Sequence, residues 1–235
     1  MRRWLAGRVD LLRLAAVTLG GHRFWLLPLV PLAWPLFQAG TILLGMEEGF
    51  EPVNAQGALI GFPLTLLAMF LGIRIIAGEI DGRSLEIAYT VPGGCEKVWL
   101  AKLTAAFAIL VAAEIPLAIV TWVFFTPFPA SALYGALQPA TFYLILAMAM
   151  ATLFRSEAGG AMATIAILAL NGLIAGFGEN QVRVSPFWNA HAIESADPGQ
   201  LLAWSLQNRI GVALAALAIL SLAFMRANRR ERMLE

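Results

Sequence analysis

The sequence predicts an all-α membrane protein with six transmembrane helices. Of its 235 residues, 60% are hydrophobic and 13% are charged, whereas a soluble domain carries roughly 25% charged residues. The apolar residues are gathered in runs of about 20 or more, the length that an α-helix needs to cross the hydrocarbon core of a bilayer. The loops between these runs differ in their content of Lys and Arg, which is typical of a chain that crosses the membrane several times.

Residues 2–22 predict an N-terminal amphipathic helix that lies in the membrane interface. The apolar residues that share one helical face are Leu5, Val9, Leu12, Ala16 and Leu19. Arg3, Asp10 and Arg13 lie away from that face, as in helices that lie flat among the headgroups. The alternative is a juxtamembrane extension with no role beyond anchoring.

Six apolar runs follow, and each predicts one span. They cover about 24–46, 58–77, 98–125, 132–154, 161–177 and 201–225. Pro28, Pro31 and Pro35 predict a kinked or partly broken first span, because proline lacks an N–H and its ring clashes with the preceding turn. Trp99 suits an interfacial anchor at the start of the third span. The small-residue runs 147–151 and 159–163 predict close helix packing.

The distribution of charge predicts the orientation. If both termini are cytoplasmic, all but two of the 16 Lys and Arg residues face the cytoplasm, including those of a basic tail at 226–235. Only Arg183 and Arg209 lie toward the outside, and Arg209 has about two turns of the sixth span beyond it, from where it could snorkel outward. This positive-inside pattern predicts a multi-pass protein of a bacterial cytoplasmic (inner) membrane.

The sequence lacks the motifs that would make this chain an enzyme. No GxxxxGK[ST] phosphate loop, GxSxG elbow or HExxH motif is present, so we expect neither ATP binding of the P-loop kind nor hydrolase chemistry in this chain. The single cysteine, Cys95, cannot form an internal disulfide, and no Cys/His cluster has the spacing of metal ligands. The sequence therefore predicts a conduit or scaffold.

The polar segment 78–97, between the second and third spans, predicts a docking element for a soluble partner. Its charged residues within about two helical turns are Glu79, Asp81, Arg83 and Glu86. Gly82 permits a bend at low steric cost, and Pro92 with two following glycines ends the helix and reverses the chain. A short helix across the ends of two spans can transmit a displacement, because packed spans move as rigid bodies. The alternative is a plain solvated loop.

This pattern resembles the cytoplasmic loop of the ABC type-2 permease family. The residues that carry the resemblance are Glu79, Gly82, Ser84, Leu85, Glu86 and Pro92, followed by Lys102 before a span. In that family Glu, then Gly-Thr/Ser-Leu-Glu, then Pro and Lys recur between the second and third of six spans; here Arg83 separates Gly82 from Ser84. The layout is similar over the whole chain, including the Pro-containing segment 185–188 and the Arg-rich tail, but the motif itself covers only 79–102.

The resemblance implies a coupling helix that sits in a groove of a separate ATP-binding cassette subunit. The residues expected at that interface are Glu79, Gly82, Ser84, Leu85, Glu86 and Pro92. Two permeases, as a homodimer or heterodimer, and two ATPase subunits would form an exporter whose substrate moves outward between the permeases. ATP and Mg²⁺ would bind to the ATPase, with no cofactor in this chain and no nucleic-acid partner. Residues 178–200 would form short external helices and a re-entrant turn.

Two polar residues inside the predicted spans are further candidates. Glu114 lies near the middle of the third span, where a charge costs roughly 2.5–3.5 kcal/mol on insertion scales, so it should face protein or water. It could belong to a transport pathway or make a structural hydrogen bond. Asn171 and Gln38 are candidate partners for it, or ordinary interhelical contacts.

Three other readings remain open. A cytochrome c haem-export-type permease would have six spans and a similar loop, but it would need external histidines, of which His191 is the one candidate, or a haem-handling surface. A stand-alone secondary transporter or channel would favour several intramembrane charges and an internal repeat. A membrane-embedded enzyme would need polar residues that converge inside the bilayer. The apolar spans mildly favour lipidic or amphipathic cargo.

Overall fold

The computed structural model describes residues 12–46, 49–83, 86, 89, 94–175, 181–193 and 196–228, and all regular structure in these ranges is helical. Six helices are long and apolar enough to cross a membrane: Leu12–Leu43, Pro52–Arg74, Cys95–Phe124, Ser131–Phe154, Glu157–Ala175 and Pro198–Ala227. The prediction of an all-α membrane protein with six spans is confirmed. The observed helices begin and end within a few residues of the predicted ones, except at the first two spans.

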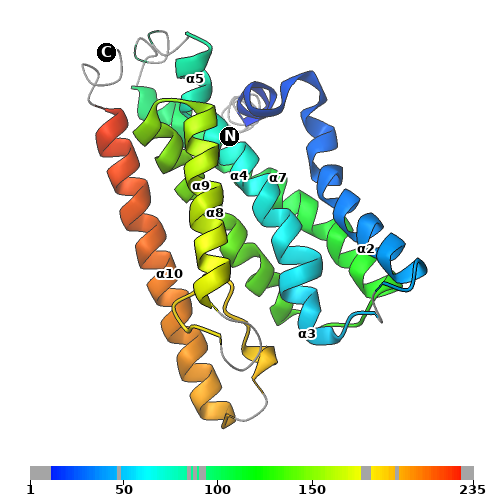
Figure 1. Ribbon diagram of the computed structural model, residues 1–235. Helices are drawn as coiled ribbons and strands as arrows, with labels where there is room; N and C mark the ends of the chain where they lie inside the picture. The colour runs from blue at the N-terminus through cyan, green and yellow to red at the C-terminus, as the bar shows by residue number, and fades with distance from the viewer. Residues whose placement is uncertain are drawn as a thin grey trace, which may run out of the picture.

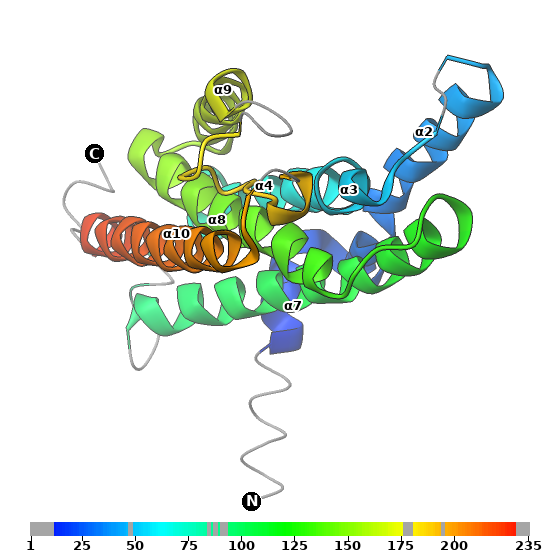
Figure 2. The ribbon, with the colours of Figure 1, turned by 90° about the horizontal axis from the view of Figure 1, so that it is seen from below.

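The labelled elements follow one another along the chain. They are η1 (Gly21–Leu32), α2 (Ala33–Leu43), α3 (Pro52–Asn54), η2 (Ala55–Gly61), α4 (Phe62–Arg74), α5 (Ala77–Asp81), α7 (Cys95–Phe124), α8 (Ser131–Phe154), α9 (Glu157–Ala175), η4 (Ala190–Ala192) and α10 (Pro198–Ala227). Figure 2 shows a middle layer of α10, α8 and α4, with α9 on one side and α7 on the other. In the apolar stretch of each span, 67% of the residues are buried in the span that contains α4 and 61% in α8. The corresponding share is 17% in α9 and 22% in α10. The core therefore lies at α4 and α8.

Close approach of backbones holds this core together. The most extensive packing in the molecule is between α4 and α8. A Cβ placed on Gly72 of α4 would lie 2.4 Å from the carbonyl oxygen of Leu144 in α8. Where α8 meets α9, a Cβ on Gly160 would lie 2.4 Å from the Cα of Ala151. The packing role predicted for the two small-residue runs is confirmed where Gly160 meets Ala151. Small residues at these positions let the helix backbones approach closely and pack.

The first helical stretch changes direction near Gly21. Figures 1 and 2 show residues 12–20 lying across the long direction of the bundle before the chain turns along it. Gly21 has φ +70° and Arg23 has non-helical angles, and the following η1 is a 3₁₀ helix that contains Pro28 and Pro31. The prolines thus accompany a 3₁₀ stretch within the predicted span, whereas the break in the helix lies earlier, at Gly21 and Arg23. In the described part of the amphipathic segment, Leu19 is buried whereas Arg13 is exposed.

The second span starts earlier than predicted. It begins at Pro52, a favoured first helical residue, rather than at about 58, and passes through the π-helical turn η2 before α4. The polar residues Asn54 and Gln56 masked this start in the sequence. Gln56 is nevertheless buried, because its amide Nε2 donates to the carbonyl oxygen of Trp188, 2.9 Å away.

The α4–α8 contact predicts that Gly72 cannot carry a side chain. Gly72→Ala should lower the free energy of unfolding by about 1–3 kcal/mol, because the added methyl group meets rigid backbone. Thermal or denaturant unfolding in detergent micelles measures this change. Gly172→Ala in α9 is the matched control, since within the described ranges no atom beyond its own helix backbone and chain neighbours lies within 4 Å of its added Cβ; equal loss in both variants would contradict the packing account.

Candidate functional site

A buried ion pair fixes the first turn of the polar segment to α7. Lys102 Nζ of α7 lies 2.7 Å from Glu79 Oε1 of α5 and donates a second hydrogen bond to the carbonyl oxygen of Ile75, at 3.3 Å. Trp99 Nε1 donates to the other carboxylate oxygen of Glu79, also at 3.3 Å. Glu79 is 9% exposed and Lys102 is 5% exposed. Because a buried charge is costly unless it is paired and hydrogen-bonded, these contacts determine where α5 lies.

Asp81 ties α5 to α9, and Arg74 at the end of α4 ties α9 to the N-terminal helix. Asp81 Oδ2 accepts a hydrogen bond of 2.9 Å from the backbone N–H of Glu157, the first residue of α9. The Glu157 carboxylate lies 3.7 Å from Arg74 Nε, and Arg74 Nη1 donates to the carbonyl oxygen of Leu19 at 2.6 Å. A negative side chain at a helix N-terminus also interacts favourably with the helix dipole. These polar contacts therefore connect α5, α9, α4 and the N-terminal helix in series.

The return of the polar segment to α7 is anchored on the end of α10. Tyr89 donates its hydroxyl to the carbonyl oxygen of Ala227 at 2.6 Å. Asn228, next along the chain, hydrogen-bonds to Glu96 and accepts from Cys95 Sγ at 3.5 Å. Gly94 precedes α7 with φ +86°, a conformation that favours glycine. Of Pro92, Gly93 and Gly94, from which the sequence predicts the chain reversal, the structure describes Gly94, whose positive φ fits a turn before α7.

The residues expected at a partner interface fall into three groups. Glu79 is buried inside the chain, whereas Gly82 and Glu86 are exposed, as are the neighbouring Asp81 and Arg83. Ser84, Leu85 and Pro92 lie outside the described residues. The left-handed residue that ends α5 is Arg83, with φ +54°, and not Gly82, whose φ is −78°. The bend therefore comes one residue later than predicted.

Trp99 does not anchor the chain at a membrane surface as predicted. Its side chain is completely buried, and its ring packs against those of Tyr89 and Phe224 with centroids 6.3 and 6.1 Å apart. The sequence could not reveal this, because interfacial and buried tryptophans have the same local context. Through these ring contacts and its hydrogen bond to Glu79, Trp99 packs beneath the polar segment.

Glu114 and Asn171 lie apart. Figure 2 shows α7 and α9, which carry them, on opposite sides of the middle layer. Glu114 is 9% exposed, and within the described residues its Oε1 has no hydrogen-bond partner. Asn171 instead donates to the Tyr143 hydroxyl at 3.2 Å and accepts from Ser185 Oγ at 3.3 Å. Asn171 is therefore an interhelical contact, and it is not the partner of Glu114.

A second polar network, which the sequence did not predict, lies at the other end of the bundle. Residues 181–193, which we call the distal cap, fold over the bundle between α9 and α10 (Figure 1). Asn208 of α10 donates to the carbonyl oxygens of Arg183 and Ser185 at 2.7 and 2.8 Å and accepts from Gln138 at 2.8 Å. Asn189 donates to the carbonyl oxygen of Val53 at 2.9 Å. Side-chain amides thereby replace water as partners of the cap backbone.

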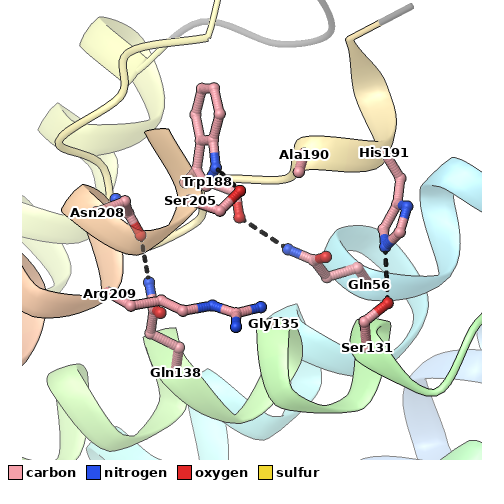
Figure 3. A pocket seen from close by; sticks show the side chains of 10 residues that line it. All are labelled: Gln56, Ser131, Gly135, Gln138, Trp188, Ala190, His191, Ser205, Asn208 and Arg209. Carbon is pink, nitrogen blue, oxygen red and sulfur yellow. Dashed lines mark hydrogen bonds between the residues drawn. The ribbon is translucent and has the colours of Figure 1, made fainter. Parts of the chain in front are cut away.

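A small cavity of about 30 Å³ lies beneath the distal cap. Figure 3 shows its lining side chains: Gln56, Ser131, Gly135, Gln138, Trp188, Ala190, His191, Ser205, Asn208 and Arg209. Ser131 Oγ and His191 Nε2 lie 3.0 Å apart, and Trp188 Nε1 donates to Ser205 Oγ at 3.3 Å. Among the side chains of the described ranges, no group of three or more His, Cys, Asp or Glu residues could hold a metal ion.

The comparisons with known proteins identify no relative: no family model, no curated protein and no solved structure matches this chain.

The ion pair between α5 and α7 predicts strong coupling between Glu79 and Lys102. Lys102→Met should lower the free energy of unfolding by about 3–5 kcal/mol, because it leaves a buried carboxylate unpaired. Adding Glu79→Gln should restore part of that loss, since no charge is then buried. Unfolding in detergent micelles measures Lys102→Met, Glu79→Gln and the double variant.

Lys97→Met is the matched control for this cycle, because Lys97 is exposed on the same helix and its replacement should change stability by no more than about 0.5 kcal/mol. Strictly additive effects of the Lys102 and Glu79 substitutions would contradict an energetic role of the ion pair.

Proposed function

We propose that this chain is the transmembrane permease subunit of an ATP-driven exporter, similar to ABC type-2 permeases. It forms the substrate pathway as a dimer and couples through the 78–97 loop to two copies of a separate ATP-binding cassette ATPase. That partner binds ATP and Mg²⁺. The proposal includes a bacterial inner-membrane location with both termini in the cytoplasm.

One observation carries the proposal: the loop that resembles a coupling element has an exposed charged surface and a buried anchor. Asp81, Arg83 and Glu86 are exposed, while Glu79 one turn away is held by Lys102 and Trp99. A displacement applied to the exposed residues would pass to α7 through the buried pair, because tightly packed groups move together. Glu79 accordingly acts from within the chain, as the residue that positions the loop.

Three further features agree with this function. Among the described residues, every Lys and Arg except Arg183 and Arg209 lies toward the end of the helix bundle that carries α5 (Figure 1). This charge distribution supports a cytoplasmic position for that end. Residues 12–20 lie across the bundle (Figure 2), which supports an interfacial helix at the inner surface. Large apolar side chains such as Leu173 and Leu214 are exposed on α9 and α10, as is expected of surfaces that face lipid or a second permease.

The proposed interface predicts the effect of reversing one exposed charge. Glu86→Lys should weaken association with the ATPase subunit at least about tenfold, because like charges brought together at an interface cost several kcal/mol. The full chain, tagged and purified from membranes of its native host, is tested for a co-purified subunit that hydrolyses ATP, and the dissociation constant is then measured for each variant.

Arg183→Glu is the control, since it reverses an exposed charge at the other end of the molecule and should leave the association unchanged. A purified complex without any nucleotide-hydrolysing subunit would overturn the proposed function. Equal association of the wild type and Glu86→Lys would remove Glu86 from the interface.

A further inference from the structure

Arg209 supplies a positive charge to the cavity under the distal cap. Figure 3 shows its side chain extending from α10 across the cavity toward Gly135. Its guanidinium carbon lies 4.4 Å from the centre of the Tyr134 ring, so the aromatic face supports the cation from one side. Among the described residues, no carboxylate forms an ion pair with Arg209, and no hydrogen bond from its guanidinium is formed. Its planar set of N–H donors is open to an external acceptor.

The other polar groups of the cavity are already engaged. Gln56 Nε2 donates to the carbonyl oxygen of Trp188, and Gln138 Nε2 donates to Asn208 Oδ1 and to the carbonyl oxygen of Pro186. Ser131 and His191 hydrogen-bond to one another. Among the described residues that line the cavity, Arg209 is therefore the one whose side chain can bind an anion strongly. An Arg guanidinium binds phosphate through paired N–H donors.

The depth of Arg209 indicates where such an anion would come from. The 30 residues of α10 extend about 45 Å, whereas the hydrocarbon core is about 30 Å thick. With α10 centred, Arg209, about 16.5 Å along its axis from Pro198, would lie about 9 Å inside the hydrocarbon boundary. A cation at this depth is costly unless it reaches the headgroups or is paired with an anion.

The surface beside Arg209 is apolar. Leu202 and Leu206 precede it by seven and three residues and share its helical face, and they are 73% and 57% exposed. Tyr134, which lies under the guanidinium, is 51% exposed. A ligand at Arg209 would therefore meet a positive charge at one end and a hydrocarbon-compatible strip along the helix.

We propose that Arg209 binds the phosphate group of an anionic amphiphile, whose hydrocarbon chain lies along Leu202 and Leu206 and whose phosphate lies at the exposed guanidinium, at the mouth of the cavity under the distal cap. The site requires no ATPase subunit, so it stands or falls independently of the exporter function.

Binding to the purified full chain in an uncharged detergent tests this proposal. The probes are phosphatidylglycerol, which is anionic, phosphatidylcholine, which is zwitterionic, and inorganic phosphate, with bound ligand quantified by native mass spectrometry. Phosphatidylglycerol should bind at least about tenfold more tightly than phosphatidylcholine. Arg209→Gln should weaken phosphatidylglycerol binding at least about tenfold, because it removes charge-assisted hydrogen bonds, whereas Arg209→Lys should retain part of the affinity.

Arg183→Gln is the matched control. Arg183 also lies over an aromatic ring, with its guanidinium carbon 3.6 Å from the centre of the Trp204 ring, but it does not line the cavity; its replacement should leave binding unchanged. Equal binding of the two lipids, unchanged affinity in Arg209→Gln, or an equal loss in Arg183→Gln would overturn the proposal. Inorganic phosphate that binds as tightly as phosphatidylglycerol would overturn the amphiphile and indicate a free-phosphate site.

Discussion

The pairing of Glu79 with Lys102 is the constraint on which the polar end of the molecule depends. A chain with 13% charged residues buries few of them, and a buried charge is costly unless it is paired and hydrogen-bonded. Lys102 meets this requirement with Glu79 and a backbone carbonyl group, and Trp99 satisfies the remaining carboxylate oxygen. These contacts determine the position of α5 relative to α7, and thereby the position of the exposed residues that follow Glu79 in the polar segment.

The two ends of the bundle are held by different chemistry. At the α5 end, ion pairs and helix-terminal contacts join α4, α5, α7 and α9. At the opposite end, the side-chain amides of Gln56, Gln138 and Asn208 hold the backbone of the distal cap. Between them, α4 and α8 approach closely at Gly72, where rigid backbones limit relative motion. Because its helices cannot easily move relative to one another, a displacement at one end of this bundle would move the other end as well.

Hydropathy and charge predicted the six spans and the two polar segments, because both signals are local and strong. The partners of individual polar residues were not predictable. Glu79 resembled the other loop carboxylates, and only the fold reveals that Lys102, 23 residues later, meets it in the interior. Gln56 and Trp188 are 132 residues apart, a separation at which no spacing rule applies. The early start of the second span and the left-handed Arg83 likewise reflect tertiary contacts that override local preference.

Hydrogen exchange of the α5 amides in the wild-type protein would show whether this short segment is part of the rigid body. The N–H groups of Glu79, Gly82 and Arg83 donate to the carbonyl oxygens of Ile76, Gly78 and Ile80, and an isolated helix of this length would not be stable in water. If the buried ion pair holds α5 on α7, these amides should exchange about as slowly as those of the second and third turns of α7, whose N–H groups are bonded within the helix. Exchange as fast as that of an unstructured loop would contradict a rigid connection between the polar segment and the spans.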